Sequence, residues 1–204
     1  MSAGGPAGGS GREITRATPD RLSSLAAMLG RAFVDEPMML WPMGEQGDRV
    51  DRFTRAFAVV LEQVLGLGLV REAGDAHGAA LWFPPAYAEP WDEHPWNDPR
   101  IGALTDDGGA RYDEFWHWVE SRTPHGALWL LDSLGVEPAL QGRGIGTALI
   151  AAGLALARAD GVGAFLTTGT KGNVSVYARS GFRVVEDLDA PGGGPHIWFM
   201  RWDP

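Results

Sequence analysis

The sequence predicts a mixed α/β domain, and three observations lead to this class. The chain has 204 residues, which is enough for one buried core. Apolar residues at helical spacing alternate along it with short apolar runs bounded by Gly or Pro, which are typical of strands. One such run, residues 128–136, passes into a glycine-rich loop that opens a helix. We therefore predict a single domain over residues 12–204, preceded by a flexible Gly/Ala/Ser tail at residues 1–11.

The first predicted elements are a strand at residues 12–17 and a helix that follows it. Thr18 can cap this helix, and Pro19 suits its first turn. An apolar stripe at helical spacing indicates a face buried in the core. It comprises Leu22, Leu25, Leu29 and Phe33. Pro37 ends the helix because it restricts the residue before it, and we predict a loop for residues 38–47.

A second helix, a hairpin and an aromatic insertion are predicted next. Residues 48–65 repeat the helical spacing, and residues 67–72 and 78–83 suit two strands of a hairpin. Residues 84–110 break the pattern with prolines and aromatic residues. Because disordered segments are poor in aromatic residues, we predict an ordered insertion that lies over the domain. A third helix is predicted at residues 110–122.

The glycine-rich loop after residues 128–136 predicts a phosphate-binding site. Residues 141–147 read QGRGIGT and lead into a predicted helix that ends near residue 159. Glycines let successive backbone N–H groups converge, and a helix N-terminus adds a positive dipole at the same place. A P-loop would need a Lys after the glycines, and a dinucleotide fingerprint would need a Gly where Thr147 stands. Neither pattern fits without adjustment.

A third pattern, [Q/R]-x-x-G-x-[G/A], is matched by Gln141, Gly144 and Gly146. It is the acetyl-CoA pyrophosphate loop of the GNAT superfamily of N-acetyltransferases, which the chain resembles here. The element Asn173-x-x-x-Tyr177-x-x-x-Gly181-Phe182 matches the same superfamily. Further strands are predicted at residues 164–168, 183–187 and 197–202. Within the superfamily, about the last eighty residues look most like the puromycin N-acetyltransferase group, and the first 125 resemble it only loosely.

The resemblance implies a fold, a cosubstrate and the residues that bind it. The implied fold is a central, mostly antiparallel sheet of about six or seven strands flanked by helices and splayed at the cofactor strand. The implied cosubstrate is acetyl-CoA, with no metal. The residues expected to contact it are Leu134, Val136, Gln141, Gly142, Arg143, Gly144, Ile145, Gly146, Thr147 and Asn173. Tyr177 matches the tyrosine whose hydroxyl points at the cofactor sulfur, and we expect it to protonate the departing thiolate.

The general base is less sharply indicated. Asp132 is a carboxylate in an otherwise apolar strand, which is costly unless it is hydrogen-bonded or used. By period two it shares a face with Leu130, Leu134 and Val136. We predict Asp132 as a catalytic residue, with a satisfied structural aspartate as the equal alternative. Weaker candidates for the base are Glu36, His94 and His117.

The acceptor is predicted to be a small amine with an apolar or aromatic body. The residues expected to bind it are Glu36, Trp41, Trp82 and Trp116. Direct transfer from a thioester needs no cysteine nucleophile, and the chain has none. Two rival functions stay open: a non-catalytic acyl-CoA-binding module, which retention of Tyr177 disfavours, and a nucleotide-binding regulator.

The composition of the chain limits the classes of partner that we expect it to bind. The formal net charge of −9 argues against nucleic acid, whose phosphates attract basic proteins, and mildly favours cationic small molecules. No stretch approaches the roughly 20 apolar residues needed to span a membrane. The N-terminus lacks the features of a signal peptide, so we expect a cytoplasmic enzyme. The resemblance also allows a homodimer.

Overall fold

A computed structural model describes residues 13–87, 91–124 and 128–204. The predicted tail and residues 88–90 of the predicted insertion lie outside these ranges. The described strands form one seven-stranded sheet of order β1-β2-β3-β4-β5-β7-β6. They are β1 (Ile14–Arg16), β2 (Val70–Ala73), β3 (Gly78–Phe83), β4 (Leu128–Val136), β5 (Gly163–Thr168), β6 (Arg183–Asp189) and β7 (His196–Trp202). Only β4 and β5 run parallel; the other neighbouring strands of the described sheet are antiparallel. The predicted mixed α/β class and mostly antiparallel sheet are confirmed.

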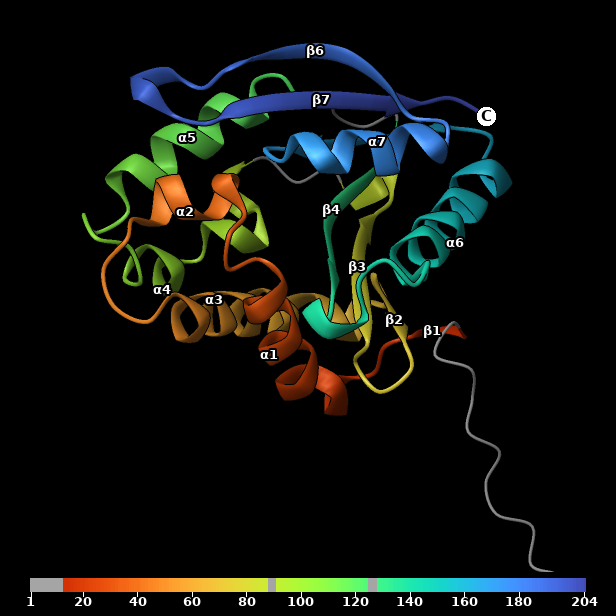
Figure 1. Cartoon of the computed structure of the whole chain (residues 1–204), viewed down its shortest axis with the longest axis horizontal. Helices are drawn as coiled ribbons and strands as arrows, with labels where there is room; N and C mark the ends of the chain where they lie inside the picture. The colour runs from red at the N-terminus through yellow and green to blue at the C-terminus, as the bar shows by residue number, and fades with distance from the viewer. Residues whose placement is uncertain (1–12, 88–90, 125–127) are drawn as a thin grey trace, which may run out of the picture.

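Helices cover both faces of this sheet (Figure 1). They are α1 (Leu22–Ala32), α2 (Pro37–Met43), α3 (Arg49–Val64), α4 (Pro99–Gly102), α5 (Ala110–Glu120), α6 (Ile145–Ala159) and α7 (Lys171–Arg179). One face packs against α1 and α3 at the β3 and β4 end, and against α2 and α5 at the β5 and β7 end. The opposite face packs against α6 and α7. In the described part of the chain, no helix has the length and apolar character to cross a membrane.

The structure corrects one predicted loop to a helix. Residues 38–47 were expected to form a loop after Pro37 ended the preceding helix, yet α2 spans Pro37–Met43. Pro37 occupies the first turn, where a missing N–H costs nothing. Pro42 lies in the last turn, and Gly44 then ends the helix with a positive φ of 83°. Each proline therefore stands where a short helix tolerates it.

The first strand of the predicted hairpin begins later than expected. A 3₁₀ turn at Leu65–Leu67 prolongs α3 until Gly68, whose φ of 73° turns the chain into β2. The predicted strand at residues 67–72 is therefore β2 at Val70–Ala73. Elsewhere, the predicted helices and strands coincide with the observed ones to within a few residues.

Two irregularities of β4 create the space for a site. β4 pairs with β5 only from Leu128 to Leu131, so the two parallel strands diverge beyond Leu131. On its other side β4 carries a β-bulge: Leu81 pairs with Ser133 while the next residue, Trp82, pairs with Leu131. Asp132 is thus the extra residue. Beyond it the side chains change faces, which corrects the prediction that Asp132 shares a face with Leu134 and Val136.

Candidate active site

A cavity of about 730 Å³ opens where β4 and β5 diverge. Its walls come from segments far apart in the sequence: the end of α1 and the start of α2, residues 91–96, α5, the second half of β4, the loop into α6, the end of β5, and α7. Divergence removes the backbone pairing that would otherwise close this part of the sheet. Most of the predicted site residues therefore meet in one hollow.

The cofactor end of the cavity is the loop into α6. Gly142 and Gly144 have φ values of 74° and 83°, in the left-handed region that glycine adopts readily. Gly144 is the N-cap of α6, so the first N–H groups of the helix are available to an anion. Gln141 Nε2 donates to the carbonyl oxygen of Val136 at 3.3 Å and ties the loop to β4. This arrangement suits a pyrophosphate.

All but one of the predicted cofactor residues line this cavity. Those that do are Leu134, Val136, Gln141, Gly142, Gly144, Ile145, Gly146, Thr147 and Asn173. Arg143, which is exposed, is not part of the lining. Asn173 lies in the first turn of α7, and its Nδ2 is 3.5 Å from Thr168 Oγ1.

Tyr177 stands one turn after Asn173 on α7 and also lines the cavity. Its side chain is 7 % exposed, and its ring meets that of Phe182 edge to face at 6.1 Å between centroids. Burial raises the pKa of the phenol well above its usual value, and the negative charge of Glu36 raises it further. Tyr177 is therefore a protonated hydroxyl at neutral pH, able to donate a hydrogen bond inside the cavity.

Glu36 is the carboxylate whose charge raises the pKa of Tyr177. It is the N-cap of α2, and its side chain accepts hydrogen bonds from Thr170 Oγ1 at 2.9 Å and from the Gly169 N–H at 3.2 Å. Burial raises the pKa of Glu36 and outweighs these hydrogen bonds, which lower it. A Cβ at Gly169 would lie 3.0 Å from Glu36 Oε1, so glycine permits the close approach. Glu36 is thus a half-buried carboxylate that two hydrogen bonds fix, and its charge acts on the tyrosine.

Asp132, the bulge residue of β4, provides a second carboxylate. Its Oδ2 accepts hydrogen bonds from Trp96 Nε1 at 3.0 Å and from Ser133 Oγ at 2.8 Å. Trp96 is itself fixed: its carbonyl oxygen accepts from Tyr112 Oη at 3.0 Å, and its ring packs edge to face on Phe57. Trp96 and Ser133 were not predicted as site residues, because no spacing rule links residue 96 to a bulge in β4.

Aromatic side chains form the wall near Asp132. The predicted Trp116 belongs to it, together with Trp91, Trp96 and His94, which line the same cavity. Trp91 stacks on Trp116 with 6.0 Å between ring centroids and on His94 with 5.7 Å, each at an interplanar angle of 18°. Part of the predicted insertion is thus a cavity wall.

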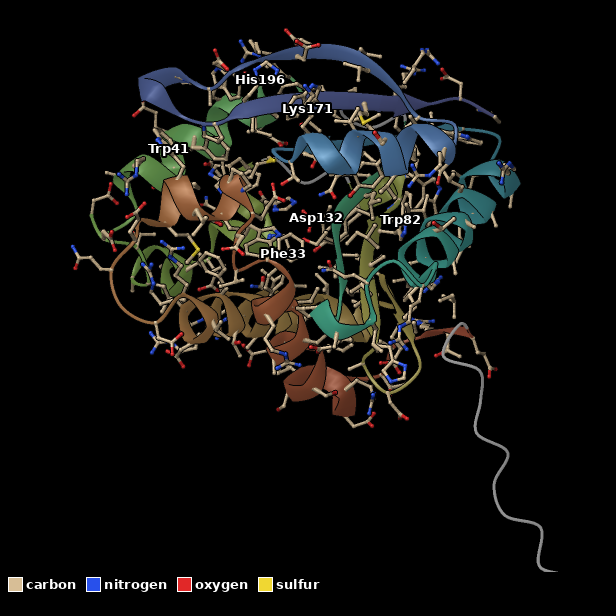
Figure 2. All side chains as sticks on the ribbon, in the orientation of Figure 1. Phe33, Trp41, Trp82, Asp132, Lys171 and His196 are labelled. Carbon is tan, nitrogen blue, oxygen red and sulfur yellow. The ribbon has the colours of Figure 1, made fainter. Side chains whose placement is uncertain are left out.

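Two predicted substrate-binding residues lie elsewhere (Figure 2). Trp82 is 1 % exposed and packs on the opposite face of the sheet, where it contacts Gly153 of α6. Trp41 packs on Phe115 and lines a separate, smaller hollow beside Pro195. Neither reaches the cavity in this structure. His117, one of the weaker candidates for the base, also lies outside the cavity lining and contacts the Asp113 carbonyl.

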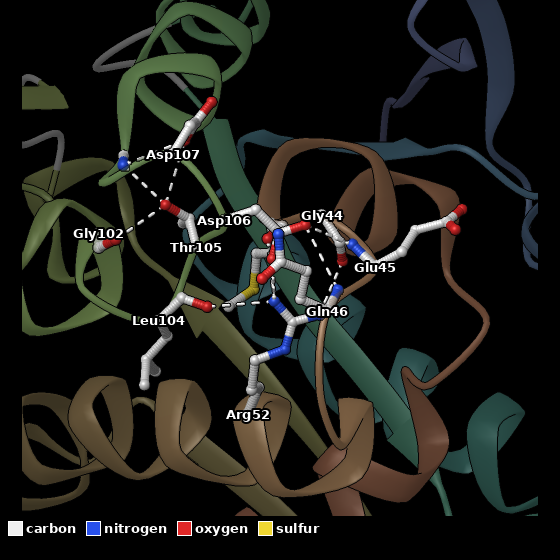
Figure 3. A network of polar contacts seen from close by, with 11 residues as sticks. Gly44, Glu45, Gln46, Arg52, Gly102, Leu104, Thr105, Asp106 and Asp107 are labelled. Atoms are coloured by element: carbon white, nitrogen blue, oxygen red, sulfur yellow. Dashed lines mark hydrogen bonds and ion pairs between the residues drawn. The ribbon is translucent and has the colours of Figure 1, made fainter.

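A buried arginine fastens the insertion to the N-terminal helices (Figure 3). Arg52 of α3 is 9 % exposed. Its guanidinium donates to the carbonyl oxygens of Met43, Gly44 and Leu104 at 3.1, 2.8 and 3.2 Å. It also forms an ion pair with Asp106 at 3.1 Å. The chain that follows the aromatic wall is thereby tied to the end of α2.

Comparison with known proteins identifies the family. The acetyltransferase (GNAT) family matches residues 74–182, more than half of the chain. Mycothiol acetyltransferase of Clavibacter michiganensis subsp. michiganensis (strain NCPPB 382) is 34 % identical over 92 residues, which cover 44 % of this chain and 29 % of that protein. The chain thus matches less than a third of the length of this relative.

Solved structures share the fold over nearly the whole chain. A protein of Corynebacterium glutamicum ATCC 13032, described as histone acetyltransferase HPA2 and related acetyltransferase, superposes with a TM-score of 0.69 at 21 % identity, covering 94 % of this chain and 95 % of that one. A polyamine N-acetyltransferase of Drosophila melanogaster does so with a TM-score of 0.59 at 14 % identity, covering 94 % and 99 %. The resemblance to the puromycin N-acetyltransferase group stays a prediction. The chain belongs to the acetyltransferase (GNAT) family, a family of acyltransferases.

Proposed function

We propose that this protein is an acetyl-CoA-dependent N-acetyltransferase that acts on a small amine with an apolar or aromatic body. The observation that carries the proposal is the single cavity that holds an anion-binding helix start, a protonated tyrosine and two carboxylates. The name of the matched relative, a mycothiol acetyltransferase, agrees with acetyl transfer.

Acetyl-CoA would occupy the cavity from the loop toward Tyr177. The glycines of that loop leave its N–H groups open to a pyrophosphate, and the edge of β4 beyond Leu131 has no pairing to β5, so its backbone is free for the pantetheine arm. Bound acetyl-CoA supplies an acetyl group already activated as a thioester. The protein then has to position the amine and manage two protons.

One proton leaves the attacking amine, and the other is taken up by the departing sulfur. The amine nitrogen forms a bond to the acetyl carbon and loses a proton, while the carbon–sulfur bond breaks and the sulfur takes one up. Tyr177 Oη holds a proton where the thiolate would leave. The carboxylate of Glu36 is the proton acceptor whose charge raises the pKa of that tyrosine. Its own raised pKa makes it a better base than a free glutamate. Asp132 is the alternative acceptor.

A thermal-shift panel with acetyl-CoA, CoA, ATP and NAD tests the cofactor. We expect stabilisation of about 2.7 kcal/mol at a ligand concentration of 100 Kd for the two CoA species, and none for ATP or NAD. Release of free thiol in the presence of aromatic alkylamines then tests transfer. Binding of CoA without any amine-dependent thiol release would favour a non-catalytic module, and stabilisation by ATP or NAD alone would favour a nucleotide-binding regulator.

A further inference from the structure

Glu36 and Asp132 are two carboxylates of one cavity, and neither has a positive partner in the part of the chain that the structure describes. Among the described residues, neither forms an ion pair with Arg, Lys or His. By contrast, Glu137, which follows β4, forms an ion pair with Arg31 at 2.6 Å. Half-buried charges are costly without a partner, so a ligand with matching charge would relieve both.

The two carboxylates are held on different elements, Glu36 at the start of α2 and Asp132 on β4. Glu36 is fixed by the segment that joins β5 to α7 and acts on Tyr177. Asp132 is fixed on β4 through its Oδ2 alone. No described side chain or N–H donates to its Oδ1. Glu36 thus lies by the proposed point of acyl transfer, and Asp132 lies on β4 with an oxygen, Oδ1, that accepts no hydrogen bond from the described residues.

The bulge and Trp96 together give Asp132 its place. In a strand without the bulge, strict alternation of side chains would decide which face of the sheet residue 132 points to. Its carboxylate would then lose the hydrogen bond from Ser133 Oγ. Trp96 reaches it from the aromatic wall, where Trp91 is 5 % exposed and its Nε1 has no hydrogen-bond partner among the described residues. The wall therefore offers a flat apolar surface with the carboxylate beside it.

We propose that the acceptor carries a second positive charge that is not acetylated, and that Asp132 binds it. The acceptor class is then an aromatic diamine or a similar dication, whose reacting amine faces Glu36 and Tyr177. This inference rests on the proposed function, since it names the substrate class of that site. It assigns Asp132 a role in specificity instead of proton transfer.

A pair of acceptors that differ by one charge tests the inference. 1,4-Bis(aminomethyl)benzene carries an ammonium group where 4-ethylbenzylamine carries a methyl group, and the two are otherwise alike in shape. A longer pair, 1,4-bis(2-aminoethyl)benzene and 2-(4-propylphenyl)ethylamine, covers a second spacing. We expect the diamine of at least one pair to have a kcat/KM roughly 10- to 100-fold higher, the range for one charge-assisted hydrogen bond. Equal values within both pairs, or preference for the monoamines, would overturn the inference.

The Asp132→Asn variant separates specificity from catalysis. We expect the ratio of kcat/KM for the diamine to kcat/KM for the monoamine to fall below about threefold in this variant. An equal loss for both amines would assign Asp132 to catalysis or to folding and overturn the inference. Glu114→Gln, which removes an exposed carboxylate of α5 outside the cavity, is the matched control and should keep the wild-type preference.

Two further measurements keep the test independent of turnover and of folding. Titration of CoA-loaded protein with each amine, followed by calorimetry, gives affinities even without acetyl transfer; equal affinities would overturn the inference. Failure of the proposed function shows separately, as absence of CoA binding. If Asp132→Asn does not fold, Trp96→Phe removes the indole N–H that donates to Asp132, together with part of the ring in the wall, and should lower the diamine preference several-fold. An unchanged preference would count against the anchor.

Discussion

Tyr177 carries a phenol that the fold keeps protonated. Burial and the charge of Glu36 both disfavour the phenolate, so the pKa of Tyr177 lies well above that of a free tyrosine. A thiol of pKa about 8.5 is a stronger acid than this phenol. Full transfer of the proton from this phenol to a thiolate is therefore uphill, and Tyr177 acts chiefly by donating a hydrogen bond to the developing thiolate.

The Tyr177→Phe variant tests this role. It keeps the ring that packs on Phe182 and removes the donor, so acetyl-CoA affinity should barely change. Turnover should fall by roughly 10²–10⁴-fold, the range for losing one general acid. Stopped-flow thiol detection at saturating acceptor measures it. Turnover close to the wild type would mean that the thiolate takes its proton from another group.

Glu36 makes the stability of the protein depend on pH. Its pKa is raised in the folded state, mainly by burial, so the neutral form is the one that folding favours. The stability it contributes is present below its ordinary pKa and is lost as the pH rises through the raised value. Ionised Glu36 thus costs stability at neutral pH, in exchange for a carboxylate beside Tyr177.

Glu36→Gln removes this charge and nearly keeps the shape. We expect its melting temperature, relative to the wild type, to rise between pH 4 and pH 7, because only the wild type acquires a half-buried charge over that range. Differential scanning calorimetry at several pH values measures the difference, in which the titration of all other groups cancels. A difference that does not change with pH would show that Glu36 ionises in the fold as easily as in water.

At the scale of single elements, sequence patterns predicted regular structure and missed exceptions to it. β4 and the loop into α6 follow from an apolar run and glycine spacing, and the structure has them where expected. The bulge at Asp132 leaves no mark in the sequence of β4, since it depends on the register with β3. Trp82 and Trp41 show the same limit: composition marked them as ligand-like, while only the fold decides which tryptophans face a cavity and which fill the core.

The two ends of α6 allow a test of where the nucleotide binds, because the glycine after the helix is a control for the glycine before it. Gly144 precedes the helix with φ 83° and Gly161 follows it with φ 68°, and an added Cβ meets no atom within 4 Å at either position. Alanine at each should cost stability by about 1 kcal/mol through backbone strain alone. Only Gly144→Ala should also weaken CoA binding, because only that end receives the pyrophosphate. Isothermal titration with CoA compares the two; equal affinities would place the nucleotide away from this helix start.

For the molecule as a whole, the helices at each end of the sheet are joined by polar contacts as well as by packing. Arg52 gathers the end of α2, helix α3 and residues 104–106 around one buried guanidinium. Removing one partner of a buried ion pair leaves the other charge unpaired, which commonly costs about 3–5 kcal/mol.

Arg52→Met should therefore destabilise the whole protein by several kcal/mol. Its control is Arg55→Met on the same helix, where the ion pair with Asp51 spans 3.6 Å and both side chains are more than half exposed. That change should cost less than about 0.5 kcal/mol. Urea unfolding of the two variants gives the comparison. Similar unfolding free energies would mean that the contacts of Arg52 hold only the loop and leave global unfolding unaffected.

The bulge in β4 also limits how the sequence of such a protein can change during evolution. Asp132 and the glycine loop belong to one short, uninterrupted piece of chain, so an insertion or deletion between them would exchange the inner and outer faces of β4 and turn the loop away from the cavity. Part of the aromatic wall comes from a separate segment, which the hydrogen bond of Trp96 to Asp132 and that of Arg52 to the Leu104 carbonyl oxygen hold in place. Substitutions in that segment would change the surface offered to the acceptor, while a change in length between the bulge and Gln141 would move the glycine loop itself.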